Sequence, residues 1–372
     1  MGTLEQADAG TAAEHTAAQA AEEGTEVAGS RGSNGRRGSQ QKKQRRRRRW
    51  WAAIALTVLA VALVLSLTPW PSAMLIRSVF EQGAKATVAE MLPYVPDTPL
   101  REQTDIAYAP DGRMDSYTPA DAKGPLPTVV WIHGGAWISG DKRDVAPYLQ
   151  ILAAKGYTTI GLSYPIAPET TYPNAVDDIN TALAYIKDHA AELNVDAKQI
   201  VLAGDSAGAQ LASQMATLTV NPDYANLLGI EPALAKEDLA ATILHCGVYD
   251  LRAMAELNGL AAWGFKIALW GYTGTKDWSE TYAGSTMSTI EFANGDLPPT
   301  FISGGNADGL TWLQSIPYSN KLKSEGVPVT QLFWAAHHST DLPHEYQFHL
   351  DFPEAQEARD KTFDFLGQHT TR

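Results

Sequence analysis

Cysteine is nearly absent from this 372-residue sequence, whose single thiol belongs to Cys246. One cysteine excludes an intrachain disulfide and a metal cluster held by several thiolates. Cys246 follows the apolar run 241–244, which is typical of a strand, so we expect a small buried core residue. The thiol therefore says little about the redox compartment in which the protein works.

Basic residues are scarce outside the N-terminal segment. Residues 1–49 carry ten Lys or Arg against six Asp or Glu, whereas residues 50–372 carry 19 basic and 36 acidic residues, a net charge of −17. Nucleic-acid-binding proteins present a basic face to the phosphates, so this acidic body argues against a nucleic-acid partner. The basic run 42–49 directly precedes an apolar stretch, and membrane topology explains it better than a nucleic-acid-binding tail does.

Large apolar side chains are almost missing from residues 1–40, which are rich in Ala, Gly, Glu, Ser and Gln. Such a composition cannot bury enough surface to offset the entropy lost on ordering. We therefore expect residues 1–49 to be a disordered tail that ends in basic residues.

Charged residues are absent from the eighteen-residue stretch 50–67. At ~1.5 Å rise per residue, a helix of this length nearly covers a hydrocarbon core of ~30 Å. Five arginines at 45–49 precede the stretch, two tryptophans begin it, and Trp70 lies just beyond its end. Because basic residues stay on the cytoplasmic side and tryptophans favour the interfaces, the pattern predicts a signal-anchor helix over 50–68, with a cytoplasmic N-terminus and an extracytoplasmic body.

Two other interpretations of the apolar stretch stay open, a cleaved signal peptide and a buried core helix. A leader of about fifty residues is long for a signal peptide, and no A-x-A cleavage site follows at once. Residues 69–96 are expected to form a connector that ends in the Pro-rich MLPYVPDTP, and residues 97–372 to form the folded body.

Short apolar runs alternate with helix-like patterns through the body. Apolar residues recur at helical spacing over 175–186 and 211–218. Alternation of strands and helices predicts an α/β domain, a mostly parallel sheet flanked by helices. The six predicted strands are 128–132, 158–162, 199–203, 241–244, 300–303 and 329–334.

The pentapeptide GDSAG (204–208) stands between the predicted strand 199–203 and a predicted helix. In G-x-S-x-G the glycines admit a sharp turn and leave the central serine exposed at its tip. Ser206 is therefore the candidate nucleophile, which needs a base to take its proton. An ordinary turn with Ser206 as a helix N-cap is the alternative.

A second glycine motif, HGGAW (133–137), follows the first predicted strand. Paired glycines let backbone N–H groups point at one place, as the stabilisation of an oxyanion requires. The candidate donors are the N–H groups of Gly135, Ala136 and Ala207, the residue after the candidate nucleophile. A plain strand–helix turn is the alternative, and His133 is expected to stay neutral and to shape the loop.

HGGAW, SYPIAPE (163–169) and GDSAG together resemble the hormone-sensitive-lipase-like and bacterial carboxylesterase branch of the α/β-hydrolases. The resemblance covers roughly residues 100–372, and the motifs follow the order of that family. It implies an α/β-hydrolase fold and a Ser-Asp-His triad that needs no cofactor and no metal. Ala136 departs from the glycine loop of that family, in which a third glycine is often found at this position. An alanine still supplies the backbone N–H, so we expect the width of the pocket to change more than the activity.

The family order Ser…Asp…His implies where the triad acid lies. Asp308 follows the predicted strand 300–303 within GGNADGL, and it would orient the histidine and stabilise the imidazolium. A turn-capping role between the glycines is the alternative for Asp308. Asp250, after the strand 241–244, is the second candidate, and we expect it to be structural.

The resemblance also implies that the base lies between the last strand and a terminal helix predicted over 354–366. His344 fits best, because an aromatic residue follows shortly, as in the family, and the helix begins about ten residues later. His338 and His337 stay open as alternatives.

A zinc site is a further alternative in this region. Imidazole and carboxylate groups are zinc ligands, and the sequence between the last strand and the terminal helix holds both. No HExxH or other recognised zinc spacing occurs there, so no metal is predicted. The residues in question are His337, His338, His344, His349, Asp341 and Glu345.

Residues 251–295 form a cap-like insertion that is rich in aromatic side chains. In this family such an insertion usually covers the site and shapes the acyl pocket, while plain packing against the sheet is the equal alternative. The aromatic residues are Trp263, Phe265, Trp270, Tyr272, Trp278, Tyr282 and Phe292.

The sequence thus predicts a serine hydrolase that cleaves a carboxylic ester, small or lipid-like, through an acyl-enzyme at the outer, membrane-facing surface of the cell. The N-terminal helix is the expected membrane contact, no cofactor is expected, and the oligomeric state is not predicted. Two alternatives stay open: hydrolysis of an amide or formamide by the same residues, and a non-catalytic binding module that keeps the fold.

Overall fold

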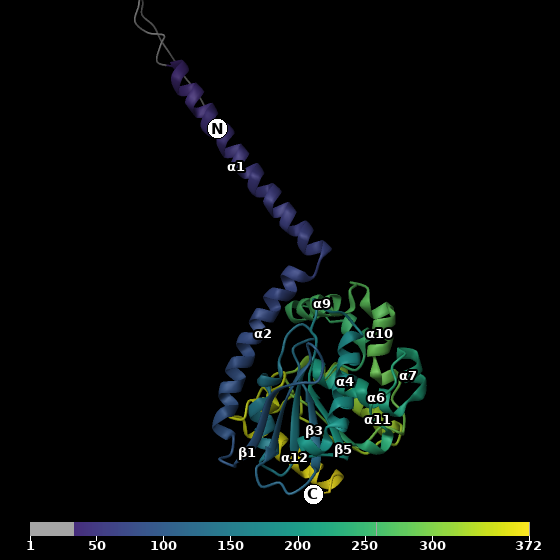
Figure 1. The fold of residues 1–372 in the computed structure, drawn as a ribbon. Helices are drawn as coiled ribbons and strands as arrows, with labels where there is room; N and C mark the ends of the chain where they lie inside the picture. Colours follow the sequence, from purple (N-terminus) through teal and green to yellow (C-terminus); the bar gives the residue numbers. More distant parts are fainter. Residues whose placement is uncertain (1–32, 258, 372) are drawn as a thin grey trace, which may run out of the picture. The chain divides into compact units, whose positions relative to one another are not determined.

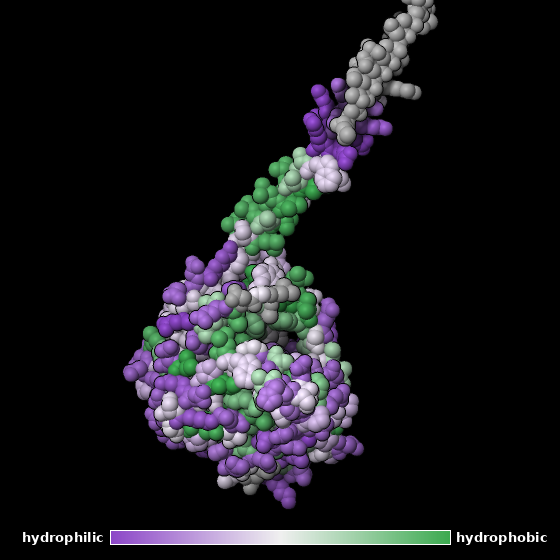
Figure 2. Space-filling model, turned by 180° about the vertical axis from the view of Figure 1, so that it is seen from behind, coloured by the Kyte–Doolittle hydropathy of each residue, from purple (hydrophilic) through white to green (hydrophobic). Residues whose placement is uncertain are grey.

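The computed structural model describes residues 33–257 and 259–371. The chain divides into two compact units, Met1–Leu63 and Val64–Arg372. Helix α1 (Ser33–Leu67) begins in the first unit and ends in the second. Its segment Ser39–Leu67 is the one helix among the described residues that is long and apolar enough to cross a membrane. Figure 2 shows a hydrophilic surface near the start of this segment and a hydrophobic surface over the rest of it.

The predicted tail corresponds only partly to the structure. Residues 1–32 of the predicted disordered tail 1–49 lie outside the described residues. From Ser33 onward the chain is helical, which corrects the expectation of disorder over 33–49. Lys, Arg and Gln are good helix formers, and an existing helix extends at little cost, so the basic run continues the apolar helix despite its lack of large apolar groups.

The described residues of the second unit contain one eight-stranded sheet in the order β1-β2-β4-β3-β5-β6-β7-β8. Strand β2 is antiparallel to β1 and β4, and the other neighbours are parallel. This confirms the predicted α/β class with a mostly parallel sheet. The strands are β1 (Leu100–Ala107), β2 (Arg113–Pro119), β3 (Leu126–Ile132), β4 (Thr158–Ser163), β5 (Val195–Asp205), β6 (Leu239–His245), β7 (Thr300–Gly304) and β8 (Val329–Phe333).

The six predicted strands correspond to β3–β8, whereas β1 and β2 were not predicted. Both are rich in polar residues, so neither shows the apolar runs that indicate a buried strand. Strand β2 is nevertheless buried between β1 and β4, and its Asp115 forms an ion pair with Lys142 at 2.8 Å. Tertiary partners thus compensate for a composition that alone disfavours burial.

Helices cover both faces of the sheet (Figure 1). In β3, Val130 and Ile132 belong to the buried cluster that contains α4 and α6, while Val129 and Trp131 belong to the cluster that contains α3 and α12. This alternation follows from the two-residue period of a strand. The helices of this unit are α2 (Trp70–Met91), α3 (Ala146–Ala153), α4 (Asn174–Asp188), α5 (Ala190–Leu193), α6 (Ala207–Val220), α7 (Pro222–Leu228), α8 (Leu251–Ala255), α9 (Gly259–Thr273), α10 (Tyr282–Met287), α11 (Ile316–Ser324) and α12 (Pro353–His369).

The segment 69–96, for which the sequence predicts only a connector, contains helix α2. Ala73, Ile76 and Met91 are buried against the body. At the far end of the helix, Glu90 lies 2.6 Å from His349. Helix α2 is therefore part of the folded body.

Candidate active site

Ser206 lies at the sharp turn between β5 and α6. Its backbone has φ 50° and ψ −118°, a conformation that is costly for a residue with a side chain. The flanking glycines permit the turn, since a Cβ on Gly208 would overlap the carbonyl oxygen of Ile132 and a Cβ on Gly204 would overlap the backbone of Gly208. The G-x-S-x-G motif thus places the Ser206 hydroxyl above the carboxyl end of the sheet, as the motif predicts.

The structure brings Ser206, His344 and Asp308 together. His344 Nε2 lies 2.9 Å from Ser206 Oγ, and His344 Nδ1 lies 2.8 Å from Asp308 Oδ2. Asp308 is buried, while His344 is half-buried at the wall of a cavity. A nucleophile, a base and an orienting acid in one hydrogen-bonded line is the arrangement that activates a serine.

Two loops that meet beside the sheet hold the acid and the histidine at these distances. The loop after β7 carries Asp308, and the loop after β8 carries His344. Asn306 Oδ1 accepts a hydrogen bond from the buried N–H of Leu342 at 2.9 Å, and Ala307 N–H donates to the Leu342 carbonyl at 3.0 Å. Asn306 is thus a positioning residue that the sequence analysis missed.

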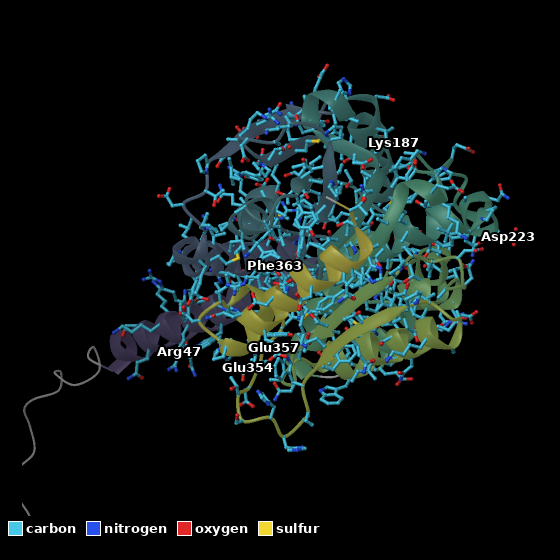
Figure 3. All side chains as sticks on the ribbon, turned by 90° about the horizontal axis from the view of Figure 1, so that it is seen from below. Arg47, Lys187, Asp223, Glu354, Glu357 and Phe363 are labelled. Carbon is cyan, nitrogen blue, oxygen red and sulfur yellow. The ribbon has the colours of Figure 1, made fainter. Side chains whose placement is uncertain are left out.

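The other candidate bases and acids have different partners. His338 Nε2 lies 2.6 Å from Glu354, at the start of α12 (Figure 3), and His349 lies 2.6 Å from Glu90. His337 is exposed. Asp250 caps α8 by accepting from the N–H groups at its start, which is the structural role expected for it. The four histidines therefore do not share a ligand set for zinc.

The HGGAW loop approaches Ser206 from the end of β3. Gly135 has φ 103° and Ala136 has φ 51°, so both adopt the left-handed region. Among the described residues, the N–H groups of Gly135, Ala136 and Ala207 have no hydrogen-bond acceptor, and Ala207 begins α6, where N–H groups have no partner within the helix. These three predicted donors remain available for an oxyanion.

The His133 side chain contacts the same loop. It is buried and stacks on Tyr164 at a centroid distance of 4.3 Å, and its Nδ1 lies 2.8 Å from the Gly134 carbonyl. Burial lowers the pKa of His133, which keeps the ring neutral. This agrees with the expectation of a loop-shaping residue.

A second carboxylate lies near the histidine. Glu345, with φ 59°, places Oε1 3.7 Å from His344 Nε2. Buried Asp205, the last residue of β5, accepts hydrogen bonds from Trp131 Nε1 at 2.7 Å and from Gly134 N at 2.8 Å. Burial raises the pKa of Asp205, and the neighbouring Glu345 carboxylate raises it further. Sequence spacing gave no signal of this pair.

The charges around His344 determine its protonation. Partial burial by itself lowers the pKa of His344, but the Asp308 carboxylate and then Glu345 and Asp205 outweigh it and raise the pKa to about 9. The neutral ring, the form that can accept a proton, therefore becomes dominant only in alkaline solution.

A cavity of about 340 Å³ opens beside Ser206. Helix α9, within the insertion 251–295, contributes Phe265, so this insertion covers part of the site while Trp270 and Tyr272 are buried in the core. Helix α2 forms another part of the wall, and its lining residues recur at helical spacing, a pattern that could have indicated a packed helix. The lining residues of α2 are Val79, Phe80, Gly83, Ala84 and Thr87.

The sheet order, the strained serine turn and the glycine loop are those of an α/β-hydrolase, which fits the resemblance to the hormone-sensitive-lipase-like branch. Solved structures share this fold: esterase B of Lactobacillus rhamnosis has a TM-score of 0.68 at 24% identity, covering 80% of this chain and 96% of that one. A bacterial heroin esterase has a TM-score of 0.64 at 24% identity, covering 80% and 91%. The sequence model of the BD-FAE family matches residues 114–322, more than half of the chain. The protein belongs to the BD-FAE family.

Curated relatives carry esterase names. The probable carboxylic ester hydrolase LipM of Mycobacterium tuberculosis is 30% identical over 220 residues, which cover 56% of this chain and 49% of LipM. Carboxylesterase NlhH of the same organism is 28% identical over 288 residues, covering 71% of this chain and 81% of NlhH. The chain thus spans about half the length of LipM and most of NlhH.

Proposed function

We propose that this protein is a serine hydrolase that cleaves carboxylic esters. The observation that carries the proposal is the hydrogen-bonded line from Ser206 Oγ through His344 to Asp308, with distances of 2.9 and 2.8 Å. The esterase names of its relatives support the same reaction class. Together they favour acyl transfer to water.

In the proposed reaction, neutral His344 Nε2 takes the Ser206 proton as Oγ attacks the ester carbonyl carbon. The negative charge that develops on the carbonyl oxygen is held by the N–H groups of Gly135, Ala136 and Ala207. The tetrahedral intermediate then expels the alcohol, which receives the proton from His344. Water, deprotonated by His344, attacks the acyl-enzyme, and the acid leaves as Ser206 regains its proton.

Asp308 has a positioning and electrostatic role in this scheme. Its carboxylate accepts a hydrogen bond from the N–H group at His344 Nδ1, so Nε2 is the nitrogen that faces Ser206. It also stabilises the imidazolium during both proton transfers. No cofactor is required.

The proposal includes membrane anchoring through α1, supported by the length and apolar composition of Ser39–Leu67. The arginines at 45–49 favour a cytoplasmic N-terminus, with the catalytic body, residues 97–372, on the outer side. Protease added to intact cells should then digest the body and spare a tag at Met1. Protection of the body would contradict this topology.

Hydrolysis of p-nitrophenyl acetate by the full chain and by Ser206→Ala tests the reaction class. We expect turnover by the wild type, and at most ~10³–10⁴-fold residual acceleration over water in the variant. Faster turnover of p-nitroacetanilide or of an aryl formamide than of the matched ester would favour the amide or formamide alternative. If the folded protein binds one of these substrates but turns over none of them, the non-catalytic binding module is favoured.

A further inference from the structure

Helix α2 connects the end of the apolar helix to the wall of the active-site cavity. Only Thr68 and Pro69 separate α1 from α2. Val79, the first cavity-lining residue of α2, lies nine residues after Trp70, about 14 Å along the helix axis. One short segment therefore joins the predicted membrane span to the cavity.

Helix α2 has a buried face and an exposed apolar row. Ala73 and Ile76 are buried, but Leu75 is 63% exposed and Val79 is 60% exposed. Leu75, Val79 and Gly83 lie four residues apart, so they form one row along the helix. Val79 and Gly83 line the cavity, and a Cβ on Gly83 would meet no atom within 4 Å. The row leads from the N-terminal part of α2 into open space beside Ser206.

Helix α9 lies beside α2 and near the last turn of α1. Lys276, just after α9, donates to the Ser66 carbonyl at 2.5 Å, and Leu65 lines a shallow hollow together with Lys266 and Trp270. Within α9, Trp263 is 44% exposed, whereas Phe265 lines the active-site cavity. Like α2, this helix presents an apolar group at the surface and another inside the cavity.

Exposed apolar and aromatic side chains thus occur on α2, on α9 and at the end of α1, all within the second unit. Tryptophan together with lysine is the combination that proteins place at a membrane–water interface. We name this surface the rim and define it as Leu67, Trp70, Leu75, Trp263, Lys266 and Lys276.

We propose that the rim rests on the lipid layer into which α1 inserts, so that the cavity takes amphiphilic esters directly from that layer along the row Leu75–Val79–Gly83. This inference rests on the proposed function and on the proposed anchor. It names the substrate class: esters whose hydrocarbon part is dissolved in the membrane and whose carbonyl reaches Ser206. The acidic body, with a net charge of −17 over residues 50–372, disfavours strongly anionic lipids, so a zwitterionic surface suits it best.

The contact is tested with the full chain reconstituted in phosphatidylcholine vesicles. The native Cys246 is buried, so a thiol-reactive fluorophore labels single cysteines introduced by Leu75→Cys, Trp263→Cys or Leu92→Cys. Leu92 is the matched control, because it is 55% exposed but lies seventeen residues beyond Leu75, about 25 Å along the helix axis. Lipids with a shallow nitroxide should quench the labels at 75 and 263 severalfold more than the label at 92. Equal quenching at the three positions would overturn the proposal.

Hydrolysis of two esters provides the second test of the proposal. With p-nitrophenyl laurate dissolved in the vesicles, Leu75→Ser and Trp263→Ser should lower kcat/KM about fivefold, as expected when one apolar contact is lost. The same variants should hydrolyse water-soluble p-nitrophenyl acetate at the wild-type rate, and Leu92→Ser should change neither rate. Equal losses of kcat/KM on the two esters would indicate that the substitutions damage the protein as a whole, and this result would contradict delivery of the substrate from the membrane. If the wild type hydrolyses no ester, the proposed function fails, while the quenching result still decides whether the rim contacts lipid.

Discussion

The guanidinium of Arg77 lies 2.6 Å from the carboxylate of Glu169 and joins helix α2 to the loop that follows β4. Arg77 also donates to the carbonyls of Ile138, at 2.6 Å, and Ala167, at 2.7 Å. Ile138 directly follows the HGGAW loop. The cavity wall formed by α2 is therefore tied to the segment that carries two of the three candidate oxyanion donors.

Arg77→Ala should loosen this wall. The change leaves Glu169 and two carbonyls without their partner, and hydrogen bonds to charged groups contribute a net stabilisation of about 1.5–3 kcal/mol each. We expect the free energy of unfolding to fall by roughly 2 kcal/mol. Because α2 lines the cavity without touching the reacting atoms, we also expect KM for long-chain esters to rise more than kcat falls. Thermal melts and steady-state kinetics measure both effects.

Arg252→Ala is the matched control for that variant. Arg252 pairs with Glu291 at 3.8 Å, and both side chains are exposed. Such surface pairs contribute about 0–1 kcal/mol, so stability and KM should stay close to wild type. Equal effects of the two substitutions would contradict the role assigned to Arg77.

Glu345→Gln should shift the pH dependence of catalysis. The acidic neighbours raise the pKa of His344 to about 9 against the effect of burial, so kcat/KM should rise with pH until the ring is mostly neutral. Removing the negative charge 3.7 Å from Nε2 lowers the pKa of His344. The rising limb should therefore move to lower pH, and the rate at pH 7 should increase.

Glu354→Gln serves as the control for this profile, since Glu354 faces His338 instead. It should leave the midpoint of the rising limb unchanged. If Glu345→Gln also leaves the midpoint in place, the Glu345 carboxylate does not set the protonation of His344.

The histidines can be separated by substitution. His344→Ala should lower kcat by several orders of magnitude with little change in the thermal melt, because only His344 reaches Ser206 Oγ in the described structure. His337→Ala and His338→Ala should retain most activity. A dead His338→Ala variant beside an active His344→Ala variant would show that the base has been misassigned.

Asn306→Ala should separate the loops that carry Asp308 and His344. It leaves the buried N–H of Leu342 without its acceptor, at a cost of about 1–3 kcal/mol, and lets the two catalytic loops drift. A misplacement of about 1 Å can lower kcat by up to ~10²-fold. Asn294→Ala removes a similar but exposed hydrogen bond, to the N–H of Asp296, and should leave kcat unchanged. Unchanged kcat in Asn306→Ala would contradict its positioning role.

Much of the sheet could be predicted from the sequence, because the parallel strands β3–β7 contain buried apolar runs. Strands β1 and β2 could not, since their polar residues are compensated by partners distant in the chain, such as Lys142 for Asp115. The helix over 33–49 was also missed, because low apolar content argues against a packed core but does not prevent a helix from continuing.

The candidate site likewise has parts that the sequence predicted and parts that it did not. Motifs predicted Ser206 and the candidate oxyanion donors, because the backbone of a nucleophile turn requires particular residues at fixed spacing. The wall formed by α2 and the raised pKa of Asp205 beside Glu345 depend on contacts between segments far apart in the sequence. No local pattern encodes such contacts.

The most direct test of the account is covalent labelling of Ser206. The full-length protein is treated with a fluorophosphonate, and the adduct is located by peptide mass spectrometry, with Ser206→Ala treated in parallel. The account predicts one adduct, on Ser206, formed at a rate that rises with pH in step with ester hydrolysis, and none in Ser206→Ala. An adduct on another residue, or labelling that persists in Ser206→Ala, would contradict it.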